Sequence, residues 1–338
     1  MNSLSPEIHI LGIDGGGTAL NGCLLRGDGE ILANRQAAPV IYAQVRGAIA
    51  QPISQLLAAL QHDANVTTGP VDFAGVCSTG VGRPADREIV GSALTAVHLA
   101  KHISVDSDAV SALTGAFAGG PGIIVNAGTG SFAFARTDSG KLVRIGGWGY
   151  LIGDEGSGFA LARNAINAAL QDWDGRGEKT ALRKFFEQHF QVESIELSIS
   201  KIYQPDFDRG RMAKLAPLVF EAAANGDAVA QRLLNETGFA LGRHVQAALQ
   251  KFEQQQSIPL VFLGGLFRRR EMLLSSFWQA LGTEKTRVQI VEARFPPVIG
   301  AALLALVQAG VTIDEDFLKR LEKSYTAKIA HPKNGNED

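Results

Sequence analysis

A strand, a glycine-rich turn and a second strand follow one another at two places in this sequence, and this repetition constrains its fold more than any other feature. The first turn is Asp14-Gly-Gly-Gly-Thr18 and the second is Ala127-Gly-Thr-Gly-Ser131. Glycine has no Cβ atom, so such turns form tight hairpins and let backbone N–H groups approach an anion closely. The repetition predicts two related domains, each opening with a hairpin.

The two turns differ from the common nucleotide-binding loops. Rossmann and Walker loops are followed directly by a helix, whereas each of these turns lies between two predicted strands. Three glycines in a row are, taken alone, as consistent with a plain hairpin as with a phosphate site. Two similar turns favour a shared polyphosphate ligand. Asp14, where the first strand ends, would then lie near a phosphate-bound Mg²⁺, or alternatively cap the turn.

The order of the predicted elements indicates an α/β fold with mixed sheets. The first three predicted strands form an antiparallel meander, after which helices and strands alternate, and the pattern starts again after residue 121. The predicted strands are 7–13, 22–26, 30–36, 71–77, 103–105, 123–125, 132–136, 141–145, 259–263 and 288–291. The predicted helices are 47–62, 85–98 and 298–309, with a mostly helical segment from residue 158 onward.

Composition narrows the class of protein. At about 150 residues per domain, a length of 338 residues suggests two domains. The formal net charge of −2 argues against a nucleic-acid partner or a polybasic membrane face. We find neither a signal peptide nor an apolar run of about 20 residues, so we expect no membrane partner. Cys23 and Cys77 are too few for a disulfide framework, which favours a reducing compartment, the cytoplasm.

A pair of acidic residues marks a candidate reaction site. Asp106-Ser107-Asp108 stands where a short predicted strand ends and a helix begins. This is a favoured place for a helix N-cap, so capping is the alternative to a chemical role. Phosphoryl transfer requires mainly positioning and a group that accepts a hydroxyl proton, and a carboxylate at this point suits that task.

A glycine-rich segment precedes the helical part of the second half. Six glycines fall within the thirteen residues from 146 to 158. This much backbone freedom favours a close-fitting ligand over a passive linker. Trp148 offers an apolar face on which a sugar ring could stack, although a single tryptophan is more often part of a core. Asp154 and Glu155 can accept hydrogen bonds from sugar hydroxyls, and Glu155 could instead cap the following helix.

Six motifs, in order along about residues 8 to 305, resemble the N-acetylglucosamine kinase and BadF/BadG ATPase branch of the acetate and sugar kinase, actin and heat-shock chaperone superfamily. They are Asp14-Gly-Gly-Gly-Thr18, Asp108-Ala109, Ala127-Gly-Thr-Gly-Ser131, Gly146-Gly-Trp-Gly149, Gly153-Asp-Glu-Gly-Ser157 and Leu263-Gly-Gly-Leu266. The resemblance implies an α/β protein of two ribonuclease-H-like (actin-like ATPase) lobes with ATP in a central cleft. It assigns residues 1–119 and the helix 298–310 to the first lobe, 120–297 to the second, and 311–338 to a C-terminal extension.

The resemblance also implies roles for individual residues. Asp108 matches the catalytic carboxylate, which would orient a sugar hydroxyl and accept its proton. Residues that match the sugar site are Ser107, Asp108, Gly147, Trp148, Asp154 and Glu155. Residues expected at the nucleotide are Asp14, Gly15, Gly16, Gly17, Thr18, Gly128, Thr129, Gly130, Ser131, Gly264 and Gly265, with Asp14 reaching Mg²⁺ through water. Gly264 and Gly265 would serve equally well as a simple turn between a strand and a helix.

The function implied is that of an ATP-dependent kinase, a homodimer, that phosphorylates a hydroxyl of an amino sugar, expected at carbon six. Two departures from the family pattern leave the sugar open. Ser107 replaces the Asn usual before the catalytic Asp, and residues 37–43 lack the Asn that helps to hold the sugar. N-acetylglucosamine, glucosamine and N-acetylmuramic acid all remain candidate substrates.

Two other functions compete with the kinase. ATPase activators of radical dehydratases or benzoyl-CoA reductases belong to the same broad family, and Ser78-Thr-Gly-Val-Gly-Arg83 resembles them. Such activators need cluster-binding cysteines, however, and Val125 stands where one is expected. The other competitor is a non-catalytic sugar or nucleotide sensor. Only about seven residues precede the first predicted strand, which argues against a DNA-binding helix-turn-helix.

Overall fold

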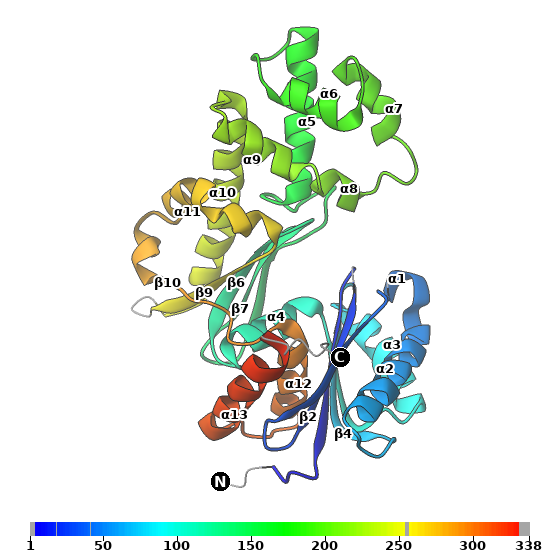
Figure 1. Ribbon diagram of the computed structural model, residues 1–338. Helices are drawn as coiled ribbons and strands as arrows, with labels where there is room; N and C mark the ends of the chain where they lie inside the picture. The colour runs from blue at the N-terminus through cyan, green and yellow to red at the C-terminus, as the bar shows by residue number, and fades with distance from the viewer. Residues whose placement is uncertain (1–3, 18, 41, 254–256, 331–338) are drawn as a thin grey trace, which may run out of the picture. The chain divides into compact units, whose positions relative to one another are not determined.

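The chain forms two compact units that we describe separately. The computed structural model describes residues 4–17, 19–40, 42–253 and 257–330 (Figure 1). One unit comprises Met1–Gly120 and Glu292–Asp338, and the other comprises Pro121–Val291. Within the described residues, no helix is both long and apolar enough to cross a lipid bilayer.

The first unit contains a five-stranded mixed sheet. Its strands are β1 (His9–Gly15), β2 (Leu20–Arg26), β3 (Ile31–Ala37), β4 (Val71–Ser78) and β5 (Ala100–Asp106). They lie in the order β3-β2-β1-β4-β5. The predicted meander is confirmed, because β2 pairs antiparallel with both β1 and β3, while β4 runs parallel to β1 and β5.

Helices cover both faces of this sheet (Figure 1). Residues such as Leu11 and Ile13 of β1 pack with the apolar stripe of α2 (Ala50–Asp63) and with α3 (Pro84–Ala96). On the other face, Ile10 packs with α12 (Pro297–Gln308) and α13 (Glu315–Tyr325). Burial on both faces explains why β1 and β4 read as nearly continuous apolar runs. The shorter elements are α1 (Tyr42–Val45), η1 (Arg46–Ile49) and η5 (Thr326–Ala330).

The close approach of α12 to the sheet depends on two glycines. A Cβ atom at Gly12 would lie 2.2 Å from the carbonyl oxygen of Val298, and one at Gly75 would lie 1.8 Å from that of Ala301. Both distances are far shorter than a van der Waals contact, so only glycine fits at these two positions.

The chain returns to the first unit earlier than the predicted boundary at residue 297. The unit resumes at Glu292, and the backbone N–H groups of Arg294 and Phe295 donate to the carbonyls of Ala116 and Gly115, both at 3.0 Å. Those carbonyls belong to the last turn of α4 (Asp108–Phe117). The segment predicted as an extension also joins this unit, since Phe317, Leu318 and Leu321 of α13 are buried in its core.

The second unit repeats the strand order of the first. Its strands are β6 (Gly122–Ala127), β7 (Ser131–Arg136), β8 (Leu142–Gly146), β9 (Ile258–Leu263) and β10 (Val288–Ile290). The sheet order is β10-β9-β6-β7-β8, with β6, β7 and β8 antiparallel and β9 and β10 parallel to β6. This is the same topology read from the opposite edge, and it confirms the internal repeat predicted from the glycine turns.

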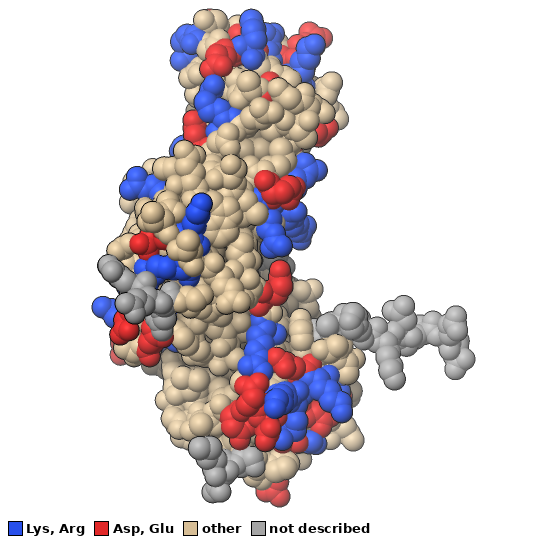
Figure 2. All heavy atoms as spheres, turned by 90° about the vertical axis from the view of Figure 1, so that its left-hand side faces the viewer, with Lys and Arg blue, Asp and Glu red and all other residues tan. Residues whose placement is uncertain are grey.

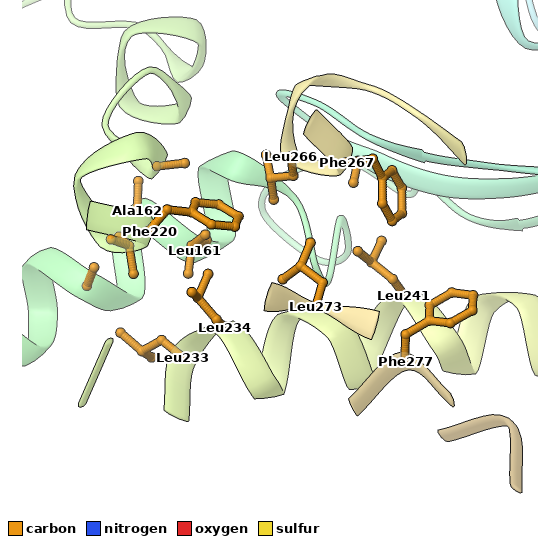
Figure 3. Close-up of a cluster of buried hydrophobic side chains, with 14 of the residues drawn as sticks. Leu161, Ala162, Phe220, Leu233, Leu234, Leu241, Leu266, Phe267, Leu273 and Phe277 are labelled. Atoms are coloured by element: carbon orange, nitrogen blue, oxygen red, sulfur yellow. The ribbon is translucent and has the colours of Figure 1, made fainter. Parts of the chain in front are cut away.

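A helical segment is inserted between β8 and β9. Its main helices are α5 (Gly158–Asp174), α6 (Leu182–Phe190), α9 (Ala216–Ala224) and α10 (Ala228–Leu249), and η3 (Gly265–Met272) and α11 (Leu274–Leu281) follow β9. Short turns η2 (Ile195–Ser198), α7 (Ile199–Ile202), α8 (Arg209–Ala213) and η4 (Gly282–Arg287) complete the unit. Leu234 and Leu241 of α10 lie in one apolar cluster with Leu161, Phe220 and side chains of η3 and α11 (Figure 3).

Charged side chains of both signs are interspersed over the face of the protein shown in Figure 2.

Candidate active site

Two predicted site residues, Asp14 and Asp108, lie together in the first unit. Asp14 of β1 pairs in register with Cys77 of β4, and Cys77 pairs with Asp106 of β5. These parallel strands end at one edge of the sheet, where ligands of α/β proteins usually bind. Asp108 is the first residue of α4, which begins directly after β5. The fold therefore brings the acidic residues of two sequence motifs to one edge.

Asp14 is a largely enclosed carboxylate. The Ser111 hydroxyl lies 3.1 Å from its Oδ1. The pKa of Asp14 is raised from 3.8 to about 6, chiefly by burial and in part by the charge of Asp108, while hydrogen bonds from Ser111 and Asn21 oppose the rise. No basic side chain of the described residues forms an ion pair with it. A negative charge held in such surroundings gains most from a cation, and this fits the predicted place near Mg²⁺.

Asp108 is held by donors on both of its oxygens. Thr79 donates from Oγ1 to Oδ2 at 2.7 Å, and the backbone N–H of Ala109 lies 3.0 Å from Oδ1. Its position in the first turn of α4 also favours a negative charge through the helix dipole. Thr79 was not among the predicted site residues, although the motif at 78–83 that contains it drew attention to this turn.

Asp106 and Ser107 have different surroundings. Asp106 is buried, its Oδ2 lies 3.0 Å from Nη1 of Arg87, and its Oδ1 accepts the N–H of Ser107. Both of its oxygens therefore serve the fold. Ser107 is the N-cap residue of α4, but its side chain makes no capping hydrogen bond. The hydroxyl of Ser107 is thus available for a ligand beside Asp108.

The first glycine turn leaves space on one side. The N–H of Gly16 donates to the carbonyl of Ala19 at 2.9 Å, which closes the hairpin. A Cβ atom at Gly15 would lie 2.8 Å from Oγ of Ser78, whereas one at Gly17 would meet nothing within 4 Å. The turn is therefore tight at Gly15 and open at Gly17, as a site for an incoming phosphate requires. Thr18 lies outside the described residues.

In the second unit, the two predicted nucleotide turns come together. Gly264 has a φ of +96°, and a Cβ atom there would lie 2.4 Å from the carbonyl carbon of Ala127. The N–H of Gly158, the first residue of α5, donates to the carbonyl of Gly128 at 2.8 Å. Gly265 has open space beside it, and Thr129 is exposed at the tip of its turn. Turns that are far apart in the sequence thus form one glycine-lined surface.

Ser131 holds this surface to the next loop. Its side chain is fully buried, and its hydroxyl donates to the carbonyl of Glu155 at 2.6 Å. Asp154 is also buried, with a φ of +59°, and a Cβ atom at Gly130 would lie 2.9 Å from its Oδ2. The carboxylate of Asp154 therefore lies against the Gly130 turn, and the predicted nucleotide and sugar residues of this unit are neighbours.

Trp148 is 65% exposed, so it is not a core residue. The guanidinium of Arg144 stacks 5.1 Å from the centre of its ring and donates to the carbonyls of Gly146, at 3.1 Å, and Gly147. This arrangement fixes one face of the indole and leaves the other to solvent. Arg144 was missed in the sequence, since a single arginine near the end of a strand carries no distinguishing pattern.

Glu155 does not cap α5, because Ser157 does: its Oγ accepts the N–H of Ala160 at 3.1 Å. Glu155 instead lies with Oε2 3.8 Å from Nε2 of His244, a buried residue of α10. Burial lowers the pKa of His244, and Glu155 and Asp154 oppose this effect. His244 was also missed in the sequence, because one polar residue on the apolar side of a long helix resembles an ordinary core histidine.

The repeated ribonuclease-H-like sheet, with a glycine turn after its first strand in both units, defines an actin-like ATPase fold. The chain belongs to the BadF/BadG/BcrA/BcrD ATPase family, which it matches over residues 11–305. Both findings confirm the resemblance inferred from the six motifs.

Named relatives cover nearly the whole chain. It is 29% identical to the N-acetylmuramic acid/N-acetylglucosamine kinase of Clostridium acetobutylicum, over 88% of this chain and 98% of that protein. It is 30% identical to the N-acetyl-D-glucosamine kinase of Dictyostelium discoideum, over 90% of this chain and 99% of that protein. A solved structure from Chromobacterium violaceum, provisionally described as an N-acetylglucosamine kinase, is similar with a TM-score of 0.72 at 28% identity, over 89% of this chain and 100% of that one.

The described residues favour neither an iron–sulfur cluster nor a multidentate metal site. No group of three or more His, Cys, Asp or Glu side chains in this part of the chain is arranged to hold a metal ion. Cys23 and Cys77 are free and buried, and burial raises the pKa of the Cys23 thiol to about 12. Val125, at the expected cluster position, is buried in β6. The relatives named as sugar kinases do not favour the activator alternative.

Proposed function

We propose that this protein is an ATP-dependent kinase that phosphorylates a hydroxyl of an amino sugar, at carbon six. The observation that carries the proposal is the Asp108 carboxylate, hydrogen-bonded on both oxygens and placed near Asp14 at the edge that holds the open glycine turn. Two relatives that match most of the chain are named as kinases of N-acetylglucosamine. The substrate class is extended from those proteins to this one.

In this proposal Asp108 is the general base. The hydroxyl oxygen of the sugar forms a bond to the γ-phosphorus, and the bond from that phosphorus to the β–γ bridging oxygen breaks, its electron pair leaving with ADP. The hydroxyl proton passes to the carboxylate of Asp108. Because such reactions demand positioning more than covalent chemistry, two fixed donors on Asp108 are a suitable design.

A single carboxylate is sufficient to contact Mg²⁺ at this site. Magnesium in kinases keeps several waters and takes its other ligands from the phosphates, and when bound it neutralises their charge. Asp14, lacking a cationic partner within the described part of the chain, would contact the ion through water. The backbone of Gly15, Gly16 and Gly17, with Thr18, would bind phosphate oxygens beside it.

The second unit would supply mainly backbone groups to the nucleotide. We propose that the residues around 128–131 bind phosphates, through the N–H groups of Gly128 and Gly130, the Thr129 side chain and the backbone of Ser131. The hydroxyl of Ser131 is already used by Glu155. Gly264 and Gly265 would lie against the adenosine: the missing Cβ of Gly264 lets the turn approach Ala127, and Gly265 has open space beside it for a flat ring.

We propose sugar-binding roles for Ser107 in the first unit and, as the family resemblance implies, for Gly147, Trp148, Asp154 and Glu155 in the second. The free face of the Trp148 indole suits the apolar face of a pyranose ring, and the carboxylates suit its hydroxyls. Because residues 37–43 contain no Asn, the identity of the sugar stays open among N-acetylglucosamine, glucosamine and N-acetylmuramic acid.

We further propose a cytoplasmic homodimer. Two buried, unpaired cysteines suit a reducing compartment, and the dimer is carried over from the family resemblance.

A sugar panel tests the proposed function. The protein is incubated with Mg-ATP and each of the three candidate sugars, with 6-deoxy-N-acetylglucosamine as the control that lacks the acceptor hydroxyl, and ADP release is measured. We expect release with at least one sugar and none with the control. Background rates throughout would contradict the proposal, and release with the control would contradict the position of transfer.

The Asp108→Asn variant tests the role of the base. It keeps the size of the side chain but cannot accept the proton, so kcat should fall by about 100-fold or more, the usual contribution of a general base. Binding of ADP, measured by calorimetry, should stay close to that of the unaltered protein. Unchanged turnover would remove Asp108 from this role.

A further inference from the structure

The turn that follows β4, Ser78-Thr-Gly-Val-Gly-Arg83, has no part in the function proposed so far. In the structure it lies at the carboxyl edge of the first sheet, beside β1. The backbone N–H of Thr79 donates to the carbonyl of Gly15 at 2.9 Å, and the N–H of Val81 donates to the carbonyl of Ser78 at 3.1 Å. One hydrogen bond therefore closes the turn internally, and another connects it to the first glycine turn.

The side chain of Thr79 contacts the proposed base directly. Its Oγ1 lies 2.7 Å from Oδ2 of Asp108, a residue 29 positions further along the chain. An ionised carboxylate can only accept hydrogen bonds, so the hydroxyl of Thr79 must be the donor. Charge-assisted O–H···O⁻ bonds of this length are stronger than neutral ones, and here the bond lies at the surface, where water competes for both groups.

This bond has a geometric consequence for Asp108. The N–H of Ala109 binds Oδ1 and Thr79 binds Oδ2, so the carboxylate is held at both ends and its rotation is restricted. Each carboxylate oxygen has more than one lone-pair direction, and one direction therefore remains for an incoming hydroxyl. The terminal torsion of an aspartate side chain has a broad preferred range. Without Thr79, the carboxylate of Asp108 would therefore lose its fixed orientation.

The same residue links the base to the phosphate turn. Thr79 binds Gly15 through its backbone and Asp108 through its side chain. Its neighbour Ser78 is buried, with Oγ 2.8 Å from where a Cβ atom of Gly15 would be. A shift of this turn would therefore move the glycine turn and release the carboxylate together.

We propose that Thr79 is a positioning residue that aims the carboxylate of Asp108 at the sugar hydroxyl. This inference rests on the proposed role of Asp108 as the base. Thr79 keeps its own proton throughout the reaction and donates to Oδ2 before and after the transfer. Because it acts on the transfer step, its loss lowers kcat and leaves substrate binding nearly unchanged.

Two substitutions at one position separate the hydrogen bond from packing. Thr79→Val keeps the shape of the side chain but removes the donor, whereas Thr79→Ser keeps the donor and removes a methyl group. We expect kcat to fall about tenfold to 100-fold in Thr79→Val, with KM for sugar and ATP within about twofold, and most of the activity to return in Thr79→Ser. Thr95→Val, which removes an exposed hydroxyl bound to the carbonyl of Gly91 within α3, is the matched control.

The outcomes distinguish this inference from the proposed function. Full activity of Thr79→Val together with an inactive Asp108→Asn overturns the inference and leaves the base in place. Equal losses in Thr79→Val and Thr79→Ser also overturn it, because packing rather than the donor would then be responsible. An active Asp108→Asn contradicts the proposed role of the base itself. Thermal unfolding and ADP binding of each variant show whether the fold is intact.

Discussion

Replacing Asp14 by Asn should make the protein more stable and less active. Burial raises the pKa of Asp14 from the ordinary value of 3.8 to about 6. A carboxylic acid whose pKa is raised by folding stabilises the fold below the unfolded value, and this stability is lost as the pH rises through the folded value. At one pKa unit per about 1.4 kcal/mol, the ionised Asp14 costs about 3 kcal/mol above pH 7. Asparagine, which keeps an acceptor for Ser111, removes this cost.

The pH dependence of the difference is the sharper test. The gain in free energy of unfolding should be about 3 kcal/mol at pH 7.5 and about 2 kcal/mol smaller at pH 4.5, because the native carboxyl is then protonated. Urea unfolding of both proteins at the two pH values measures it, and titrating groups that do not interact with Asp14 cancel in the comparison. Added Mg-ADP should stabilise the unaltered protein more than the variant. A gain that is absent at pH 7.5, or equal at both pH values, would refute the assigned cost of the charge.

Two further substitutions test the sugar loop and the packing of the first unit. Trp148→Ala should raise KM for the sugar about tenfold and leave KM for ATP unchanged, as measured by steady-state kinetics. The control is Trp173→Ala, which removes another partly exposed tryptophan of the same unit. Equal effects of the two substitutions would contradict stacking of the sugar on Trp148. Gly75→Ala places a Cβ atom 1.8 Å from a backbone oxygen of α12 and should lower the free energy of unfolding by about 3 kcal/mol or more. The control is Gly47→Ala, whose added Cβ atom would have no neighbour closer than 3.9 Å and should cost little stability. Similar denaturant midpoints for the two variants would argue against this packing.

The strands could be predicted from the sequence because local pattern and tertiary structure agree there. The first predicted strand ends at residue 13, while β1 continues to Gly15 because Asp14 and Gly15 still pair with β2 and β4. The helical segment after residue 158 could be predicted only as helical. Elements as short as α7 and α8, of four and five residues, have no periodicity to reveal their ends.

Residues of the candidate site could be predicted where they belong to a sequence motif. Residues that only contact the motif residues in the folded protein could not. The closeness of Asp14 to Asp108 follows from the sheet order, and the adjacency of Gly264 and Ala127 follows from the pairing of β6 with β9. Arg144 and His244 gave no signal, since their roles arise from contacts made after folding. Asp106 stands in the same short segment as Asp108, and the family resemblance favoured Asp108; the burial of Asp106 and its ion pair with Arg87 were not visible in the sequence.

The fit of α12 against Gly12 and Gly75 bears on how the chain matures during synthesis. Residues 121–291 are continuous and can fold as soon as they emerge from the ribosome. The strands of the other unit emerge first but wait nearly two hundred residues for the helix that covers Ile10 and Phe73. Until α12 is synthesised, the apolar face of the sheet that this helix covers stays exposed to solvent. A chaperone that binds exposed apolar surface would matter most to the nascent chain during this interval.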